Sequence, residues 1–328
     1  MHGIGLPLRE RLLAQLAAVD AGQTQFVLLA PPTPAEELKG RSQALFFLKP
    51  ELLYPELDRA LTIATVSDVL AAASITVGGV AVLGPERLAE TVAAHYGVIN
   101  RVSRLGAAAL PDEARARLEA TFGAELAAGV PCLGGSEVVD RYGVGPHELE
   151  EALSAPAKLA PGTYAALATV GGTQLLVLNG FHPAQLGHYS APRSRIVALE
   201  IHWAGLSWKD FRNTVVGATR PEQADPESVR GVLLTRQDEL AIRPVAVSTN
   251  GVHGSAGPVE AMVEVARFLE VAPAATALGS ALLDAGVSPD LIEKLASADP
   301  ESGALRQQVF DATEEVDPPT AIEHLTRL

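Results

Sequence analysis

The sequence predicts an α+β fold, a ferredoxin-like four-stranded antiparallel sheet with covering helices. Short apolar, β-branched runs alternate with amphipathic helical patterns along the chain. Without the additional segments, their order is strand, helix, strand, helices, strand, helix, strand, helix. Two additional segments accompany this core: an inserted, hairpin-rich segment and a helical C-terminal tail. Since many unrelated functions share the fold, function has to be argued from particular residues.

The chain is expected to begin with an extension, residues 1–40, before the main domain. Leucines recur at helical spacing over residues 6–21, and residues 25–30 form an extended run before a Pro-Pro break.

The main domain is expected over residues 41–270. Its four predicted strands cover residues 43–48, 75–83, 195–201 and 242–248. Its predicted helices, several of which have proline near the start, lie between the first two strands, over residues 85–96, 111–127 and 206–216, and from Pro258 onward.

The insertion is expected at about residues 129–191, where glycine and proline are frequent. It should contain a short acidic helix over residues 147–153 and a hairpin of residues 164–170 and 175–178 across Gly171-Gly172. Gly134-Gly135 is interpreted as a turn. The C-terminal extension, residues 271–328, should be helical, with breaks at Pro300 and Pro318-Pro319 and a solvated acidic stretch at residues 311–317.

Composition excludes several classes of function. A net charge of -14 argues against binding nucleic acid or an anionic membrane, which needs clustered Lys and Arg. The single cysteine, Cys132, excludes an internal disulfide and a cysteine-based metal cluster. No stretch resembles a signal peptide or reaches the roughly 18 apolar residues of a membrane span. These observations predict a cytoplasmic protein.

His253 lies between glycines, shortly after the fourth predicted strand and shortly before the helix that Pro258 opens. Free backbone N–H groups and the positive end of a helix favour anions at such a place. An imidazole beside an anion site can position a phosphate or accept it covalently. The position therefore points to phosphoryl chemistry.

Three segments together resemble the nucleoside diphosphate kinase family. They are residues 46–50 (Phe-Phe-Leu-Lys-Pro), residues 216–221 with 226–231, and residues 250–255 (Asn-Gly-Val-His-Gly-Ser) leading into a helix. They occur in the family's order, with eleven positions from Thr219 to Arg230, three from Asn250 to His253 and eleven from His253 to Glu264. The resemblance covers roughly residues 41–270, with the insertion between.

The resemblance implies that His253 accepts the terminal phosphate of a nucleoside triphosphate such as ATP and passes it to a nucleoside diphosphate. Glu264 would hold the other ring nitrogen and so fix the tautomer. Lys49 and Arg230 would neutralise phosphate charge.

The resemblance also implies lesser roles for four residues. Thr219 and Asn250 would hydrogen-bond phosphate and ribose, Tyr96 would lie near the nucleophile, and Arg212 is the candidate for a further arginine, one position upstream of the family's place. Mg²⁺ would accompany the nucleotide, no metal site of the protein's own is expected, and the implied assembly is a homo-oligomer.

The chain departs from the family pattern at several positions. Glu51-Leu52 replaces Asp-Gly after Lys-Pro, Ala256-Gly257 replaces Asp-Ser, and Val98 stands where an acidic residue is expected. The aromatic clamp for the base is not recognisable in residues 100–105, and residues 233–244 form a longer excursion. These changes bear on base binding, metal support and assembly.

Plain structural roles remain open for each candidate. His253 could be an ordinary structural histidine, Glu264 part of a solvated helix face, and Lys49 an edge lysine. Arg230 could likewise form an ordinary loop salt bridge, and Tyr96 could be a half-buried aromatic at a helix end. Thr219 and Asn250 could be turn or capping residues.

Three other histidines form a second, weaker constellation. His182 and His188 are six positions apart, and His202 is on the third predicted strand. No neighbouring carboxylates complete a metal site, and a role in shaping a pocket is the alternative.

Three functions fit these patterns. The first is a nucleoside diphosphate kinase with a phosphohistidine, and the second a divergent phosphotransferase of specialised metabolism with another acceptor. The third is a nucleotide-binding module without catalysis.

Overall fold

The computed structural model describes residues 3–95, 97–160, 162–242, 245–246, 249–297 and 300–328. It divides into two compact units. Unit 1 comprises Met1–Thr91, Ala191–Ser297 and Val309–Leu328, and unit 2 comprises Val92–Ser190 and Ala298–Gln308. Each unit is described by itself. Unit 1 includes the N-terminal extension and most of the C-terminal tail as well as the expected main domain, and unit 2 begins well before residue 129.

Unit 1 is built on a five-stranded sheet of order β1-β3-β8-β2-β9, in which every neighbouring pair is antiparallel. The strands are β1 (Phe26–Ala30), β2 (Ser42–Leu48), β3 (Thr76–Leu83), β8 (Ile196–Trp203) and β9 (Val252–Gly254). All residues of β2 and β8 are buried, since helices cover both faces of the sheet. The predicted mixed α+β class with antiparallel sheets is thus confirmed.

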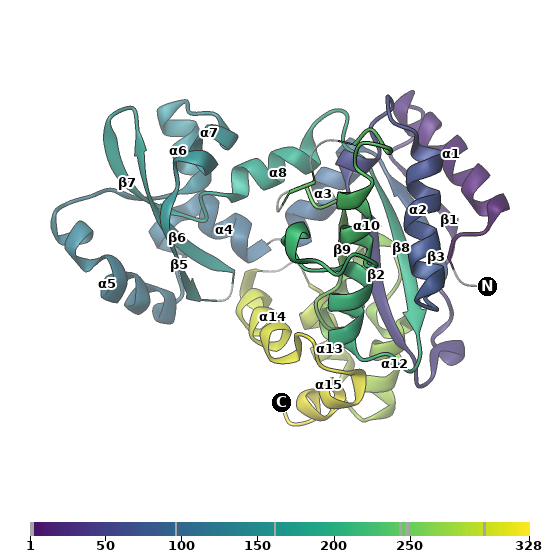
Figure 1. The fold of residues 1–328 in the computed structure, drawn as a ribbon. Coiled ribbons are helices and arrows are strands. Elements are labelled where there is room, and N and C mark those ends of the chain that lie inside the picture. Colours follow the sequence, from purple (N-terminus) through teal and green to yellow (C-terminus); the bar gives the residue numbers. More distant parts are fainter. Residues whose placement is uncertain (1–2, 96, 161, 243–244, 247–248, 298–299) are drawn as a thin grey trace. The chain divides into compact units, whose positions relative to one another are not determined.

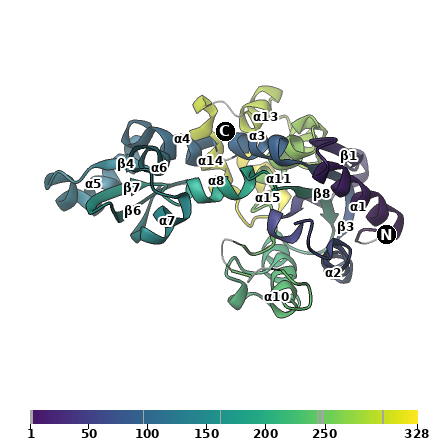
Figure 2. The same ribbon diagram turned by 90° about the horizontal axis from the view of Figure 1, so that it is seen from above.

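Helices α1 (Leu6–Asp20) and α2 (Arg59–Ala72) pack over one face of this sheet (Figures 1 and 2). Leu12 and Leu16 of α1 join one core with Val66 of α2 and with Phe46 and Leu48 of β2. The N-terminal helix therefore belongs to the main core, because its leucine stripe is buried against the sheet.

Helix α11 (Pro258–Phe268) packs against β2 on the other face, where Phe47 stacks on Phe268 with ring centroids 5.6 Å apart. Proline opens α11 because its missing N–H costs nothing at a helix start. The remaining helices of the C-terminal segment are α12 (Ala277–Asp284), α13 (Pro289–Ala296), α14 (Pro300–Thr313) and α15 (Pro318–Leu325). Pro300 and Pro318 thus begin helices at the expected breaks.

Between β8 and β9 the chain forms short helices. These are α9 (Trp208–Asp210), a π-helical turn η4 (Phe211–Val216) and α10 (Val229–Thr235). Earlier in the chain, α3 (Pro85–His95) follows β3. Gly217 ends η4 with a φ of 92°, a conformation that glycine adopts without strain.

Unit 2 contains a four-stranded sheet of order β4-β7-β6-β5. Its elements are α4 (Gly97–Leu105), α5 (Asp112–Ala127), β4 (Cys132–Gly134), α6 (Gly135–Tyr142), α7 (Pro146–Ala152), β5 (Ser154–Ala160), β6 (Thr163–Val170), β7 (Thr173–Leu178) and α8 (His182–Ser190). The hairpin β6–β7 turns at Gly171-Gly172, whose φ angles are 56° and 79°. The predicted hairpin and acidic helix are confirmed.

Two local predictions were wrong. Gly134 ends a strand and Gly135 begins a helix, so this pair is a strand-to-helix junction and not a plain turn. Of the strand predicted over residues 242–248, the described residues Ile242, Val245 and Ala246 are not in a strand, and the other four lie outside the described residues. The strand that pairs with β2 is β9, which contains His253 itself.

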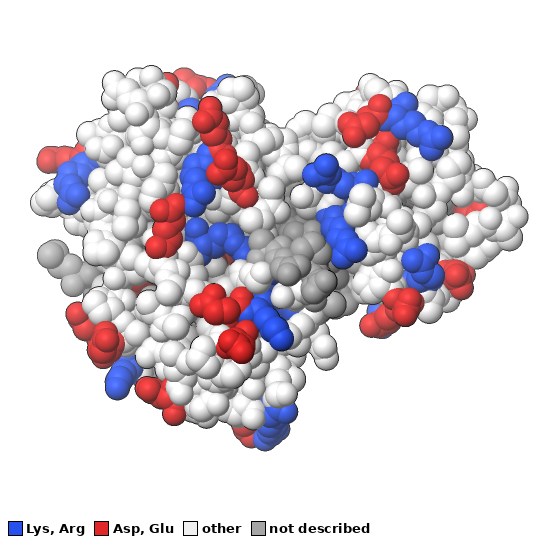
Figure 3. Space-filling view, turned by 180° about the vertical axis from the view of Figure 1, so that it is seen from behind, with Lys and Arg blue, Asp and Glu red and all other residues white. Residues whose placement is uncertain are grey.

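Among the helices of the described residues, none has the length and apolar composition of a membrane span. Figure 3 shows one face of the molecule, on which Lys and Arg side chains are interspersed with Asp and Glu. On the described part of this face, the basic side chains do not gather into one large patch.

Candidate active site

His253 is held in the middle of strand β9, directly opposite Phe47 of β2. Its ring stacks on that of Phe47, with centroids 4.6 Å apart and planes 17° apart. Gly251 precedes it with a φ of 82°, which only glycine adopts easily. The side chain keeps 20% exposure. The imidazole is therefore fixed by packing on one side and is still reachable from outside.

Glu264 of α11 lies against this ring. His253 Nε2 is 2.7 Å from Glu264 Oε1, and the Glu264 side chain is fully buried. The Ser255 hydroxyl donates to Glu264 Oε2 at 2.5 Å and accepts from the backbone N–H of Leu45 at 3.0 Å. The alternative of a solvated position for Glu264 is wrong, because residues of the sheet cover it. Ser255 is the partner that sequence reasoning did not assign, although it lies in the Asn-Gly-Val-His-Gly-Ser segment.

Lys49 directly follows β2, two positions beyond Phe47. Since side chains alternate along an extended chain, Lys49 lies on the same face of the sheet as Phe47 and His253. Its ammonium donates to Asn250 Oδ1 at 2.7 Å, and Asn250 Nδ2 donates to the backbone oxygen of Thr219 at 3.2 Å. The structure thus brings Lys49, Asn250 and the Thr219 backbone together, while the Thr219 residue itself is exposed.

Burial lowers the pKa of Lys49 from 10.5 to about 8; the nearby Glu51 acts in the opposite direction and Arg230 in the same one. Glu51 is buried and accepts the backbone N–H of Gly251 at 2.9 Å. Sequence reasoning did not assign Glu51 to the site. The signal that could have found it is its position directly after Lys-Pro, where the family that the chain resembles has another acid. A phosphate bound here would restore the charge that burial disfavours on Lys49.

Arg230, in the first turn of α10, connects the loop after η4 to β9. Its guanidinium donates to the backbone oxygen of Gly217 at 2.8 Å and to that of Val252 at 2.9 Å. These bonds hold its charge one residue from His253 along β9. The salt-bridge alternative does not describe these two bonds, since both acceptors are carbonyl groups.

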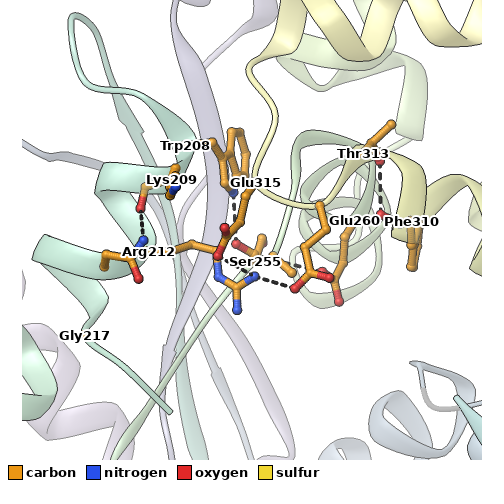
Figure 4. A network of polar contacts seen from close by, with 12 residues as sticks. Trp208, Lys209, Arg212, Gly217, Ser255, Glu260, Phe310, Thr313 and Glu315 are labelled. Atoms are coloured by element: carbon orange, nitrogen blue, oxygen red, sulfur yellow. Dashed lines mark hydrogen bonds and ion pairs between the residues drawn. The ribbon is translucent and has the colours of Figure 1, made fainter. Parts of the chain in front are cut away.

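Arg212 lies in η4 and faces the C-terminal segment. Its Nη1 is 2.7 Å from Glu314 Oε1 and 3.5 Å from Glu315 Oε1. Figure 4 shows the guanidinium of Arg212 between Glu315 and Glu260. These two ion pairs are with the tail, so they do not join Arg212 to Lys49 and Asn250.

Glu260, one turn before Glu264 on α11, accepts the backbone N–H of Ala256 at 2.9 Å. Burial and the neighbouring Glu264 raise the pKa of Glu260 from 4.5 to about 8. Two acids on consecutive turns of one helix therefore have different partners, since Glu264 contacts the imidazole and Glu260 accepts a backbone N–H from the residues that precede the helix.

The remaining predicted residues do not join this cluster. Tyr96 lies outside the described residues. His182 and His188 are on α8 in unit 2, and His202 is in unit 1, where its Nδ1 is 3.0 Å from Glu200 Oε1. Burial by itself would raise the pKa of Glu200, but hydrogen bonds from His202 and from two backbone N–H groups hold it below its ordinary value.

Comparison of the chain with models of protein families, with curated proteins and with solved structures finds no match.

Proposed function

We propose that unit 1 is a nucleotide-dependent phosphotransferase of the nucleoside diphosphate kinase type, working through a phosphohistidine at His253. The observation that carries the proposal is the contact between His253 Nε2 and the buried Glu264 carboxylate, 2.7 Å long, beside a cluster that contains Lys49 and Asn250. A ring that keeps 20% exposure and whose Nε2 contacts a buried carboxylate suits a nucleophile.

The transfer proceeds in two balanced halves. The Nε2 proton stays with the His253–Glu264 pair, and the Nδ1 lone pair attacks the terminal phosphorus. A P–N bond forms, the bond from phosphorus to the bridging oxygen breaks, and the nucleoside diphosphate leaves with that oxygen. An acceptor diphosphate then attacks the phosphohistidine, and the imidazole returns to its starting state.

Cationic groups support both halves. The Lys49 ammonium and the Arg230 guanidinium lie at the same end of the sheet as His253 and stabilise charge on the transferred phosphoryl group. Mg²⁺ enters as part of the nucleotide substrate. Asn250 orients Lys49 through their 2.7 Å hydrogen bond.

The proposed fold of this domain is ferredoxin-like. The consecutive neighbours β9-β2-β8-β3, antiparallel throughout, support this assignment, with β1 as an added edge strand.

A second candidate is a phosphotransferase with an acceptor other than a nucleoside diphosphate. The engagement of Arg212 by Glu314 and Glu315 favours it, because that arginine is then held by the tail and not by substrate. The chain also lacks the Asp and Ser that follow His-Gly-Ser in the family, having Ala256-Gly257 instead.

The test is formation of a phosphoenzyme. The full chain is incubated with γ-labelled ATP and Mg²⁺, and label that is acid-labile and base-stable is expected on the wild type and not on His253→Ala. His147→Ala serves as the control, since its side chain is 77% exposed in unit 2. Label on the His253 variant, or no label on the wild type despite nucleotide binding, contradicts the proposal; the second result leaves a binding module.

Discharge of the label separates the two candidates. Rapid discharge by common nucleoside diphosphates supports the first. Stable label in their presence supports a different acceptor.

A further inference from the structure

A cavity of about 380 Å³ lies in unit 1 at the end of the sheet where β2 begins. It opens to solvent and is lined by the starts of β2, α11 and α12, the end of β8 and the first turns of α15. Strand β2 runs from Ser42 at the cavity to Leu48, just before Lys49, a span of roughly 20 Å at the usual rise per residue. None of the residues around His253, namely Glu264, Ser255, Lys49, Asn250 and His253 itself, lines the cavity, so the cavity is a separate site.

The walls are mainly apolar. Trp203 and Trp208 line the cavity with ring centroids 5.2 Å apart, together with Met262 of α11, Leu278 of α12 and Ile322 of α15. Both tryptophan side chains are otherwise buried. The volume and the lining match those of small-molecule sites, which are apolar with a few placed polar groups.

Gln43 supplies one such polar group. It lines the cavity, is 7% exposed, and its Oε1 accepts the backbone N–H of Ala277 at 2.8 Å. That bond fixes the orientation of the amide, and among the described residues its Nε2 has no hydrogen-bond partner. A buried donor without an acceptor is unfavourable, so a ligand acceptor that reached it would be bound favourably.

The rim carries cationic groups. Lys39 and Arg41 line the cavity, are exposed, and form no ion pair with a described residue. Of the acidic side chains that line it, Asp317 is engaged, because its Oδ1 accepts the backbone N–H of Trp208 at 2.7 Å. Asp284 is exposed on the same rim. Two cations and two acids thus line the cavity, and neither cation is paired with a described acid.

We propose that this cavity binds a small amphipathic anion, with its apolar body against Trp203, Trp208 and Met262, an acceptor on the Gln43 amide and its anionic head at Lys39 and Arg41. The site is distinct from the proposed phosphotransfer centre, and the assignment does not depend on that function.

The probe is 1-anilinonaphthalene-8-sulfonate, which has an aromatic body and one anionic head. The chain contains only two tryptophans, and both line the cavity. Binding is expected to quench tryptophan emission and to enhance emission of the dye. N-phenyl-1-naphthylamine, which has the same body without the sulfonate, is expected to bind more weakly.

Matched variants locate the dye. Ala281→Phe, which fills the cavity from α12, is expected to weaken binding at least about tenfold, or by about 1.4 kcal/mol. Ala285→Phe places the same side chain at the exposed end of that helix and is expected to leave binding unchanged. Equal binding by all three proteins, or no binding by the wild type, overturns the proposal.

Charge and amide variants test the polar part. Arg41→Gln is expected to weaken binding of the sulfonate about threefold and not that of the neutral analogue, whereas Lys294→Gln, at an exposed position of α13, is expected to change neither. Gln43→Glu keeps the acceptor for Ala277 and removes the donor, so loss of dye binding is expected. Retained binding in both Arg41→Gln and Gln43→Glu overturns the assignment of the anionic head.

Competition identifies the head group. Octanoate and octyl phosphate are each expected to displace the dye at lower concentration than octanol, and the stronger of the two identifies the head as carboxylate or phosphate. Displacement by octanol at equal concentration contradicts an anionic ligand.

Discussion

Strand β2 begins in one environment and ends in another. At its start, Gln43 borders an apolar cavity and its amide nitrogen has no partner among the described residues. Just past its end, Lys49 bonds to Asn250, while His253 on the next strand bonds to Glu264. The polar side chains past the end of the strand are thus hydrogen-bonded to one another within the protein. At the start of the strand, by contrast, the Gln43 amide N–H donor has no acceptor among the described residues. One sheet can therefore present two sites of opposite character, because the helices that cover its ends differ.

The largest effect should come from Glu264→Gln at the polar end. The amide NH₂ group of glutamine can donate to Nε2, which would move the ring proton to Nδ1 and remove the lone pair needed for attack. We expect the rate of phosphoenzyme formation to fall about 10²-fold or more. Glu293→Gln, at an exposed position of α13, is the control. A rate equal to that of wild type would show that Glu264 only packs against the ring.

Lys49 should give the next largest effect, together with a pH dependence. Its lowered pKa, about 8, means that the amine is charged below that pH and neutral above it. Phosphotransfer should therefore decline as the pH rises through about 8, and Lys49→Gln should lower the rate about 10²-fold at neutral pH.

Lys49→Arg tests the assignment of this pH dependence, because arginine stays charged throughout. This variant should retain a large part of the neutral rate and lose the decline at alkaline pH. A decline that persists in Lys49→Arg would assign the titration to another group.

The elements that the sequence predicted correctly are those with a local pattern. The leucine stripe of α1, the alternation of β6 and β7 and the glycine pair between them can be read within a few residues. Strand β9 has only three residues, Val252–Gly254, which is too short for a periodic pattern. It is a strand because it pairs with β2, about 200 residues earlier. Sequence reasoning therefore placed the fourth strand in the longer apolar run before it, residues 242–248.

The candidate site divides in the same way. The family resemblance implied the contact between His253 and Glu264, but the burial of Glu264 depends on the sheet that α11 covers. The pairing of Arg212 with Glu314 joins positions 102 residues apart, which no local pattern reveals. The cavity is likewise assembled from segments distant in the sequence, and composition gave no indication of it.

A smaller effect should show whether the two ends of β2 are linked. Trp208 at the cavity donates its indole N–H to the backbone oxygen of Ser255 at 3.2 Å, and Ser255 holds Glu264. Trp208→Phe should lower the free energy of unfolding by about 1–3 kcal/mol, measured by urea denaturation, because a buried carbonyl loses its donor. It should also lower the phosphotransfer rate severalfold.

Trp203→Phe is the matched control for this link. It removes a similar indole from the same cavity, but its N–H bonds to the Leu206 backbone and not to Ser255. Equal rates for the two variants would indicate that the ends of the strand act independently.

The smallest effect expected is on stability, at Glu260. The folded chain holds the Glu260 proton up to a pKa of about 8, whereas the ordinary value is 4.5. Between these values unfolding releases a proton, so the free energy of unfolding contributed by this group falls as the pH rises.

Glu260→Gln removes that contribution while keeping an acceptor for the Ala256 N–H. Relative to wild type, the variant should gain about 2 kcal/mol in unfolding free energy between about pH 6 and about pH 8. Urea denaturation at several pH values measures the difference, with Glu293→Gln as control. A difference that does not grow with pH would mean that Glu260 is already ionised in the folded chain. Glu260 and Glu264 would then each carry a negative charge on consecutive turns, and the charge of the nearby Arg212 would have to offset their repulsion.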